Sequence, residues 1–177
     1  LLGESHYGSE NDAWFNDELT RLTIQEKIGE APNDAIFHNK VFHTNIFYAF
    51  NDLPKSKEDL NQFWHSVSFF NYVQNSVGPK ARIRPKKEDW KLSYEAVRKT
   101  LELLDPDIIV VLGYQLWDNI WRQFDLINSI RTDFNNGRNI HELAFGNQPL
   151  FFPIKHPSSG FSSSYFRPFL TKYILTK

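Results

Sequence analysis

One apolar run limits what this chain can fold into more than any other feature. The run covers 107–112 (Asp-Ile-Ile-Val-Val-Leu) and follows a segment over 86–104 whose apolar side chains recur with helical spacing. An almost fully apolar strand beside a helix is typical of a central parallel strand, because helices cover both faces of such a strand. Gly113 then turns the chain into a second amphipathic segment. This order predicts an α/β fold.

The rest of the chain continues the alternation of strands and helices. We therefore expect a three-layer α/β/α architecture around a mostly parallel sheet. No internal repeat or linker interrupts 1–177, which predicts a single domain. Because the chain opens on what resembles the tail of a core strand, we expect a further N-terminal segment before it. The remaining predicted strands are 1–3, 66–74, 140–145 and 150–154, and the remaining predicted helices are 14–28, 35–50, 54–64, 114–124 and 164–175.

Composition excludes several classes of protein. The 177 residues carry 20 basic and 21 acidic side chains, so the net charge of the chain does not indicate a polyanionic partner. The absence of cysteine excludes disulfides, thiolate catalysis and cysteine-bound metals. No apolar run approaches a membrane span and no signal peptide is visible, so we expect a cytoplasmic protein without a membrane partner. Histidine spacing predicts no metal site, and no Walker or Rossmann glycine pattern occurs.

Four polar loops are expected at one edge of the predicted sheet. They follow predicted strands and cover 4–12, 71–87, 113–115 and 155–162. Loops that leave the carboxyl ends of parallel strands open on the same edge, where α/β proteins bind ligands. The two ends of the chain therefore predict one shared site.

A His-Pro-Ser turn follows the last predicted strand. Taken alone, His156 is more often a structural histidine that caps a helix or bonds a loop carbonyl. A rigid turn at a strand end can instead expose the imidazole, which then stabilises charge on a leaving group. Ser158 and Ser159 fit turn or cap positions, and their backbone N–H groups can also bind an anion.

Asn71 and the first loop carry the other polar groups of interest. Asn71 is predicted near the end of an apolar strand, where its carboxamide either bonds neighbouring backbone or presents a donor and an acceptor to a nucleobase. Glu4 is either a polar loop residue or a group that orients water or balances a cationic transition state. Tyr7 and Phe15 offer rings for stacking on a flat ligand, although Phe15 fits a helix–core face equally well.

One dense basic stretch follows the Asn71 strand. A solvated loop is its default interpretation, but its place beside the predicted edge also suits contact with a phosphate backbone. Its members are Lys80, Arg82, Arg84, Lys86 and Lys87.

Four short motifs occur in a fixed order along the chain: 3–6 (Gly-Glu-Ser-His), 70–73 (Phe-Asn-Tyr-Val), 106–113 (Pro-Asp-Ile-Ile-Val-Val-Leu-Gly) and 156–158 (His-Pro-Ser). In this order they resemble the uracil-DNA glycosylase superfamily, as a divergent member would. The resemblance spans nearly the whole chain and is strongest over 68–117.

The resemblance implies a fold and a reaction. The fold would be a uracil-DNA glycosylase-like domain with a four-stranded parallel sheet and DNA across its carboxyl edge. The reaction would be the base-excision step of DNA repair, hydrolysis of the base–sugar bond of uracil or another modified base. The target nucleotide would be flipped or single-stranded, because the bond cannot be reached inside the stack. No metal or organic cofactor would be needed, and we expect a monomer.

The resemblance also implies residue roles. His156 would stabilise the oxygen of the departing base, and Asn71 would bind the base edge. Glu4 falls on the acidic or amide position of the first motif, Tyr7 on a ring that limits pocket size, and Phe161 on a wedge that fills the gap left by the flipped base. Ser5 and Phe15 complete the expected base-binding set, and Ser158, Ser159, Arg82, Arg84 and Lys86 complete the expected DNA-binding set.

The chain departs from the family pattern in the first motif. His6 stands where the family has proline, and Ser5 stands where its best-known branch has the aspartate that activates water. The cluster cysteines of the thermostable branch are absent. Glu4, Glu10 and Asp12 are therefore alternative groups for positioning water, and spacing does not choose among them.

Two other functions compete with base excision. One is a non-catalytic module on the same fold that binds nucleic acid or nucleobases. The other is a hydrolase of small nucleosides or nucleotides, which the near-zero net charge favours over the DNA functions.

Overall fold

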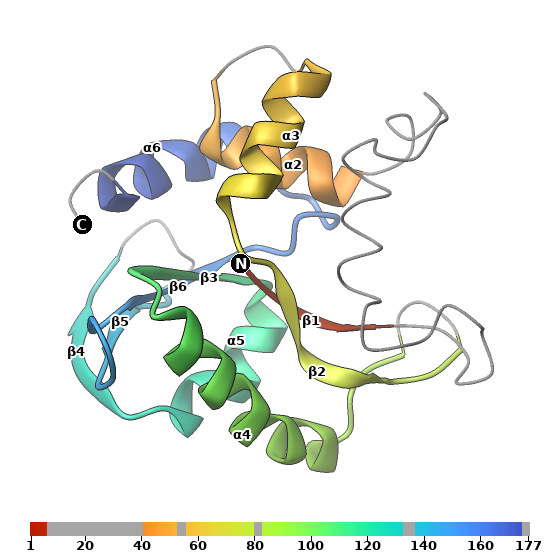
Figure 1. Cartoon of the computed structure of the whole chain (residues 1–177), viewed down its shortest axis with the longest axis vertical. Coiled ribbons are helices and arrows are strands. Elements are labelled where there is room, and N and C mark those ends of the chain that lie inside the picture. Colours follow the sequence, from red (N-terminus) through yellow and green to blue (C-terminus); the bar gives the residue numbers. More distant parts are fainter. Residues whose placement is uncertain (7–40, 53–55, 80–82, 133–136, 175–177) are drawn as a thin grey trace. The chain divides into compact units, whose positions relative to one another are not determined.

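The computed structural model describes residues 1–6, 41–52, 56–79, 83–132 and 137–174 (Figure 1). The chain divides into two compact units, which are described in turn. The sheet unit comprises Leu1–Phe15 and Phe70–Ile154, and the helical unit comprises Asn16–Phe69 and Lys155–Lys177. That residues 1–177 form a single domain stays a prediction.

The sheet unit contains a six-stranded mixed sheet in the order β2-β1-β3-β6-β5-β4. The first four strands in this order are parallel, whereas β5 pairs antiparallel with both β6 and β4. The expected α/β class is confirmed, but the expected number of four strands is wrong, because β4 and β5 extend the sheet beyond the parallel part. The strands are β1 Leu2–His6, β2 Phe70–Ser76, β3 Ile108–Leu112, β4 Leu126–Ile130, β5 Ile140–Leu143 and β6 Leu150–Ile154.

Helices α4 (Lys87–Leu104) and α5 (Tyr114–Ile120) flank this sheet, and a 3₁₀ turn, Trp121–Gln123, follows α5. Both helices lie where the periodicity of the sequence predicts them. Their apolar stripes enter one buried cluster with the sheet, which fixes them on it. The cluster includes Trp90, Val97 and Leu101 of α4, Leu116, Trp117 and Ile120 of α5, and Ile109, Val111 and Phe151 of the strands.

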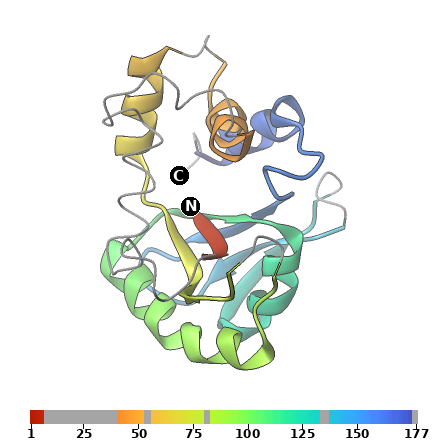
Figure 2. The same ribbon diagram turned by 90° about the vertical axis from the view of Figure 1, so that its right-hand side faces the viewer.

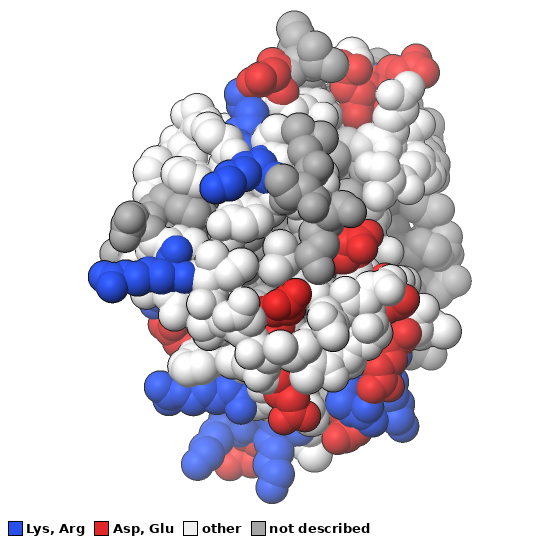
Figure 3. Space-filling view, turned by 90° about the vertical axis from the view of Figure 1, so that its left-hand side faces the viewer, with Lys and Arg blue, Asp and Glu red and all other residues white. Residues whose placement is uncertain are grey.

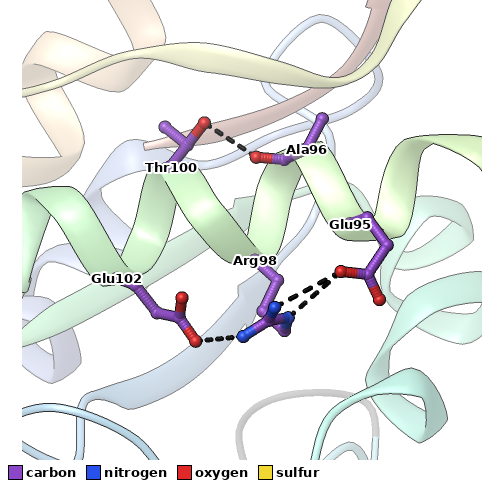
Figure 4. Close-up of polar contacts among 5 residues, drawn as sticks. All are labelled: Glu95, Ala96, Arg98, Thr100 and Glu102. Atoms are coloured by element: carbon purple, nitrogen blue, oxygen red, sulfur yellow. Dashed lines mark hydrogen bonds and ion pairs between the residues drawn. The ribbon is translucent and has the colours of Figure 1, made fainter.

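The polar side of α4 carries exposed ion pairs (Figure 4). The guanidinium of Arg98 contacts the carboxylate of Glu95 at 3.3 Å, one turn before it, and that of Glu102, one turn after it. Such exposed pairs along a helix add only a few tenths of a kcal/mol. The packed stripe, and not this network, therefore determines where α4 lies.

The helical unit consists of α2 (Val41–Phe50), α3 (Lys57–Ser66) and α6 (Ser163–Ile174), which Figure 2 shows from a second side. A capping box begins α3: the hydroxyl of Ser56 accepts from the N–H of Asp59, and the Asp59 carboxylate accepts from the N–H of Ser56, each at 3.0 Å. Aromatic edge contacts such as Phe47–Phe63, with ring centroids 5.7 Å apart, pack α2 on α3.

Two expected boundaries are wrong. Helix α3 continues to Ser66, so β2 begins at Phe70 and not at Ser66. Strand β1 runs to His6, so Glu4 lies within a strand and not in a loop. Leu2 pairs with Phe70 where both strands begin, and His6 pairs with Ser76 where both strands end, so the pairing of β1 with β2 accounts for both boundaries.

Charges of both signs occur together on one face of the molecule. On the face shown in Figure 3, Lys and Arg side chains lie interspersed with Asp and Glu side chains, which agrees with the net charge of −1. Any recognition of phosphate must therefore come from local groups.

Candidate functional site

The His156 turn, residues 155–162, precedes α6 in the helical unit. The N–H of Ser159 donates to the carbonyl oxygen of His156 at 3.0 Å, which closes a four-residue turn. Gly160 has φ 55°, in the left-handed region that favours glycine, and an added Cβ would lie 3.1 Å from Nζ of Lys155. Glycine at this position therefore lets the chain leave the turn toward α6.

Ser158 fixes the hydrogen bonding of the His156 ring. Its backbone N–H donates to Nδ1 of His156 at 3.3 Å, and its Oγ lies 2.9 Å from the same nitrogen. A nitrogen that accepts from a backbone N–H carries a lone pair, so in the neutral imidazole the ring proton resides on Nε2. In the neutral ring, the turn therefore leaves Nε2 as the hydrogen-bond donor of His156.

Helix α2 contacts the same turn. Nδ2 of Asn45 donates to the carbonyl oxygen of Pro157 at 2.6 Å. The ring of Phe42, one helical turn earlier on α2, lies 5.4 Å from the His156 ring between centroids. The imidazole is thus held from its own turn and from a helix more than 100 residues earlier in the chain.

The end of the turn caps α6 and packs a phenyl ring. Oγ of Ser162 accepts from the N–H of Tyr165 at 3.3 Å, as an N-cap does. The half-buried ring of Phe161 stacks on that of Phe166, with centroids 4.9 Å apart and planes 11° apart. Phe161, the expected wedge, is therefore packed against α6.

The sheet unit places Glu4 against a basic side chain. Oε1 of Glu4 lies 2.8 Å from Nη1 of Arg84, the residue expected to contact phosphate. The Glu4 side chain is 7% exposed, and the Arg84 side chain is 49% exposed. A buried carboxylate is thus paired with a guanidinium that reaches solvent, and no local motif predicts this pair.

Asn71 lies near the start of β2, as its second residue, and not at the carboxyl end where the sequence predicted it. The residue is buried, and its backbone carbonyl accepts a hydrogen bond from Nε2 of Gln74. A buried carboxamide has both a donor and an acceptor to satisfy.

The register of β1 and β2 separates two of the expected site residues. Gly3 is paired with Asn71 and Ser5 with Val73. Because side chains alternate along a strand, Ser5 and Asn71 share one face of the sheet and Glu4 projects to the other. The Oγ of Ser5 is buried and has no hydrogen-bond partner among the described residues. Ser5, and not Glu4, is therefore on the side of Asn71.

The remaining expected site residues lie outside these contacts. Lys86 is exposed at the start of α4, where its N–H donates to Oδ2 of Asp89 at 2.6 Å. Tyr7, Phe15 and Arg82, with the alternatives Glu10 and Asp12, lie outside the described residues. Within the part of the chain that the structure describes, no three His, Asp or Glu side chains gather in a group that could hold a metal ion.

Sequence reasoning missed Phe42, Asn45 and the partner of Glu4. Asn45 and Pro157 are 112 residues apart. The sequence pattern of α2 predicts an amphipathic helix and nothing more. No local pattern marks such contacts, because they depend on how distant segments pack.

Comparison with known proteins adds no assignment. Neither the protein-family models nor the curated proteins contain a match to this chain. Among the described helices, none combines the length and apolar character needed to cross a membrane.

Proposed function

We propose that this chain is a divergent member of the uracil-DNA glycosylase superfamily that hydrolyses the N-glycosidic bond of uracil or another modified base in DNA. The bond between the base and C1′ of the sugar breaks, and the base leaves with the electron pair. The oxygen of a water molecule then bonds to C1′, and the proton lost by that water neutralises the base. The substrate is single-stranded DNA or a duplex with the target nucleotide flipped out.

The observation that carries this proposal is the hydrogen bonding of His156. Ser158 donates to Nδ1, so Nε2 is the donor of the neutral ring. A neutral donor aimed at a developing oxyanion stabilises the transition state more than the ground state, by about 2.7–4 kcal/mol for one such group in other enzymes. An anionic base leaving with its carbonyl oxygen on Nε2 is the chemistry that this arrangement suits.

The other roles are proposed residue by residue. Asn71 binds the Watson–Crick edge of the base through its carboxamide. Ser5, whose buried hydroxyl lies on the same face of the sheet, orients water where the family has aspartate. Phe161 fills the space left by the flipped base. Arg84 and Lys86 contact the DNA backbone together with the hydroxyls of the His156 turn.

A second candidate function is a binding module without catalysis. The ion pair between Glu4 and Arg84 favours it, because the carboxylate is engaged and the strand directs it away from the face of Asn71. Such a module would bind oligonucleotides with a strong dependence on salt and would release no base.

The test is a base-release assay over oligonucleotides that carry uracil and a panel of other modified bases, single-stranded and in mismatched duplexes. Free modified deoxynucleosides form a separate arm. The proposal predicts release from at least one oligonucleotide and none from the free nucleosides. The control is the His65→Gln protein, which changes an exposed histidine of α3 that has no proposed role and should release base at the rate of the wild type.

Each other outcome assigns a different function. Binding that weakens with salt, without release of any base, would support the binding module and overturn the enzyme. Turnover of free nucleosides without affinity for DNA would assign the chain to small-nucleoside hydrolases.

A further inference from the structure

We propose that Asn45 and Phe42 of α2 are positioning residues that keep the His156 ring in a single tautomer and orientation. This inference rests on the proposed role of His156, but it concerns a property of the free protein that can be measured without DNA. Neither residue belongs to the motifs that link the chain to glycosylases.

Asn45 holds the backbone of the His156 turn. Its Nδ2 donates to the carbonyl oxygen of Pro157 at 2.6 Å, between the histidine and the serine that bonds it. The carbonyl of Pro157 and the N–H of Ser158 belong to the same peptide group, which is planar. Fixing the oxygen therefore fixes the direction of the N–H that donates to Nδ1 of His156.

Phe42 restricts the ring itself. The two ring centroids lie 5.4 Å apart with planes at 44°, and Phe42 is half-buried against a second ring, that of Phe69, at 6.3 Å. A phenyl ring packed in this way occupies space that the imidazole would need in order to rotate about its side-chain bonds. Residues 42 and 45 are one helical turn apart and so act from the same side of α2.

Helix α2 is fixed at its C-terminal end by contacts with α6. Nε of Arg167 on α6 donates to the carbonyl oxygen of Tyr48 at 2.8 Å, and its Nη1 pairs with the carboxylate of Asp52. The buried Phe166 and Leu170 of α6 belong to the same unit. The turn therefore contacts α2 directly through Asn45, and it leads into α6, which contacts the C-terminal end of α2 through Arg167. A catalytic group held in this way needs little reorganisation during the reaction.

The experiment measures the ¹⁵N resonances of His156 in long-range ¹H–¹⁵N spectra of the wild type and of Asn45→Ala, Asn45→Asp and Phe42→Leu. Asn45→Asp keeps the shape of the side chain but removes the N–H donor. Asn51→Ala is the matched control, because Asn51 also donates from Nδ2 to a carbonyl of α2, that of Phe47, but does not contact the turn. Urea unfolding of each variant establishes that it is folded.

In the wild type and in Asn51→Ala, we expect the widely separated Nδ1 and Nε2 resonances of a fixed Nε2–H tautomer. In both Asn45 variants and in Phe42→Leu the two resonances should move toward each other, because the tautomers exchange. Where base release is measurable, kcat should fall by about 10-fold or more with KM unchanged, since small displacements of a catalytic group are costly. Folded Asn45 variants with the spectrum of the wild type would overturn the inference, whether or not the protein releases any base.

Discussion

The backbone N–H of Ser158 lies 3.3 Å from Nδ1 of His156 and donates to it, while the Ser158 hydroxyl lies 2.9 Å from the same nitrogen. The backbone N–H thus donates to the lone pair of Nδ1, and the hydroxyl lies beside the same nitrogen. The histidine is prepared as a donor through Nε2 before any ligand arrives.

Ser158→Ala should weaken but not abolish the fixed orientation and tautomer of the His156 ring. The substitution removes the hydroxyl and its contact with Nδ1, and leaves the hydrogen bond from the backbone N–H to Nδ1. A typical hydrogen bond contributes about 0.5–1.5 kcal/mol, which corresponds to a fall of ~2- to 10-fold in the rate of base release. Single-turnover rates would measure this fall. A loss as large as that of a variant without the imidazole would mean that Ser158 has a direct role in the reaction.

Ser5→Asp should increase base release. Ser5 shares the face of Asn71 and stands where the resembled family has its water-activating aspartate. A positioned general base contributes about 10²–10⁴-fold in other enzymes, and a carboxylate introduced without further adjustment should give the lower end of that range or less. Ser5→Asn, which matches the size without the charge, is the control. Equal rates for folded Ser5→Asp and Ser5→Asn would remove Ser5 from the water-binding role.

Removing Arg84 from its ion pair with Glu4 should destabilise the fold more than neutralising Glu4. Arg84→Ala leaves a buried carboxylate without its partner and should lower the free energy of unfolding by about 1–3 kcal/mol, nearer the lower value because water reaches the exposed side of Arg84. Glu4→Gln should cost less, and the double variant should recover part of the loss of Arg84→Ala. Urea unfolding measures all three, with Lys86→Ala as a neighbouring exposed control. Additive losses would contradict a coupled pair.

His141 should make stability depend on pH. Its ring lies nearly parallel to the rings of Trp117 and Trp121, with centroids 5.3 Å and 5.2 Å away. Burial lowers the pKa of His141 below its ordinary value of 6.5, and a hydrogen bond with the backbone of Asn128 opposes this in part. Because the folded pKa is the lower one, the stability is fully present above pH 6.5 and is lost as the pH falls through the folded pKa.

Urea unfolding at pH 7.5 and at pH 5 tests this expectation. The wild type should lose more stability between the two conditions than His141→Phe, which keeps a flat ring beside the two indoles but does not titrate. His65→Gln, at an exposed position on α3, retains His141 and should keep its contribution. An equal loss in the wild type and in His141→Phe would assign the pH dependence to other groups.

Elements with one strong periodicity could be predicted from the sequence. The apolar β3 and β6 and the amphipathic α4 and α6 lie within a residue or two of their expected positions, since burial on two faces or on one stripe leaves a clear pattern. Strand β4 was missed because only Leu126, Ile127 and Ile130 are apolar in it and its middle is exposed. An edge strand of this kind takes its structure from pairing with β5, which the sequence of β4 does not encode locally.

The candidate site was predictable by residue type but not by geometry. The β-branched and aromatic residues after Trp64 favoured a strand from Ser66, yet the capping box at Ser56 begins a helix that runs to Ser66. Because α3 includes Ser66, β2 begins at Phe70, and Asn71 lies near the start of the strand and not near its end. The partners that decide chemistry, such as Asn45 for Pro157 and Arg84 for Glu4, lie 112 and 80 residues away and depend on tertiary packing.

The most direct test of the central claim compares the single-turnover rate of base release by the wild type and by His156→Ala, on an oligonucleotide from which the wild type releases a base. Binding to the same sequence with an uncleavable nucleotide is measured in parallel. If His156 stabilises the departing base, the rate should fall by about 10²–10³-fold while the affinity for the uncleavable oligonucleotide changes little. A folded His156→Ala protein that releases base at the rate of the wild type would contradict the account.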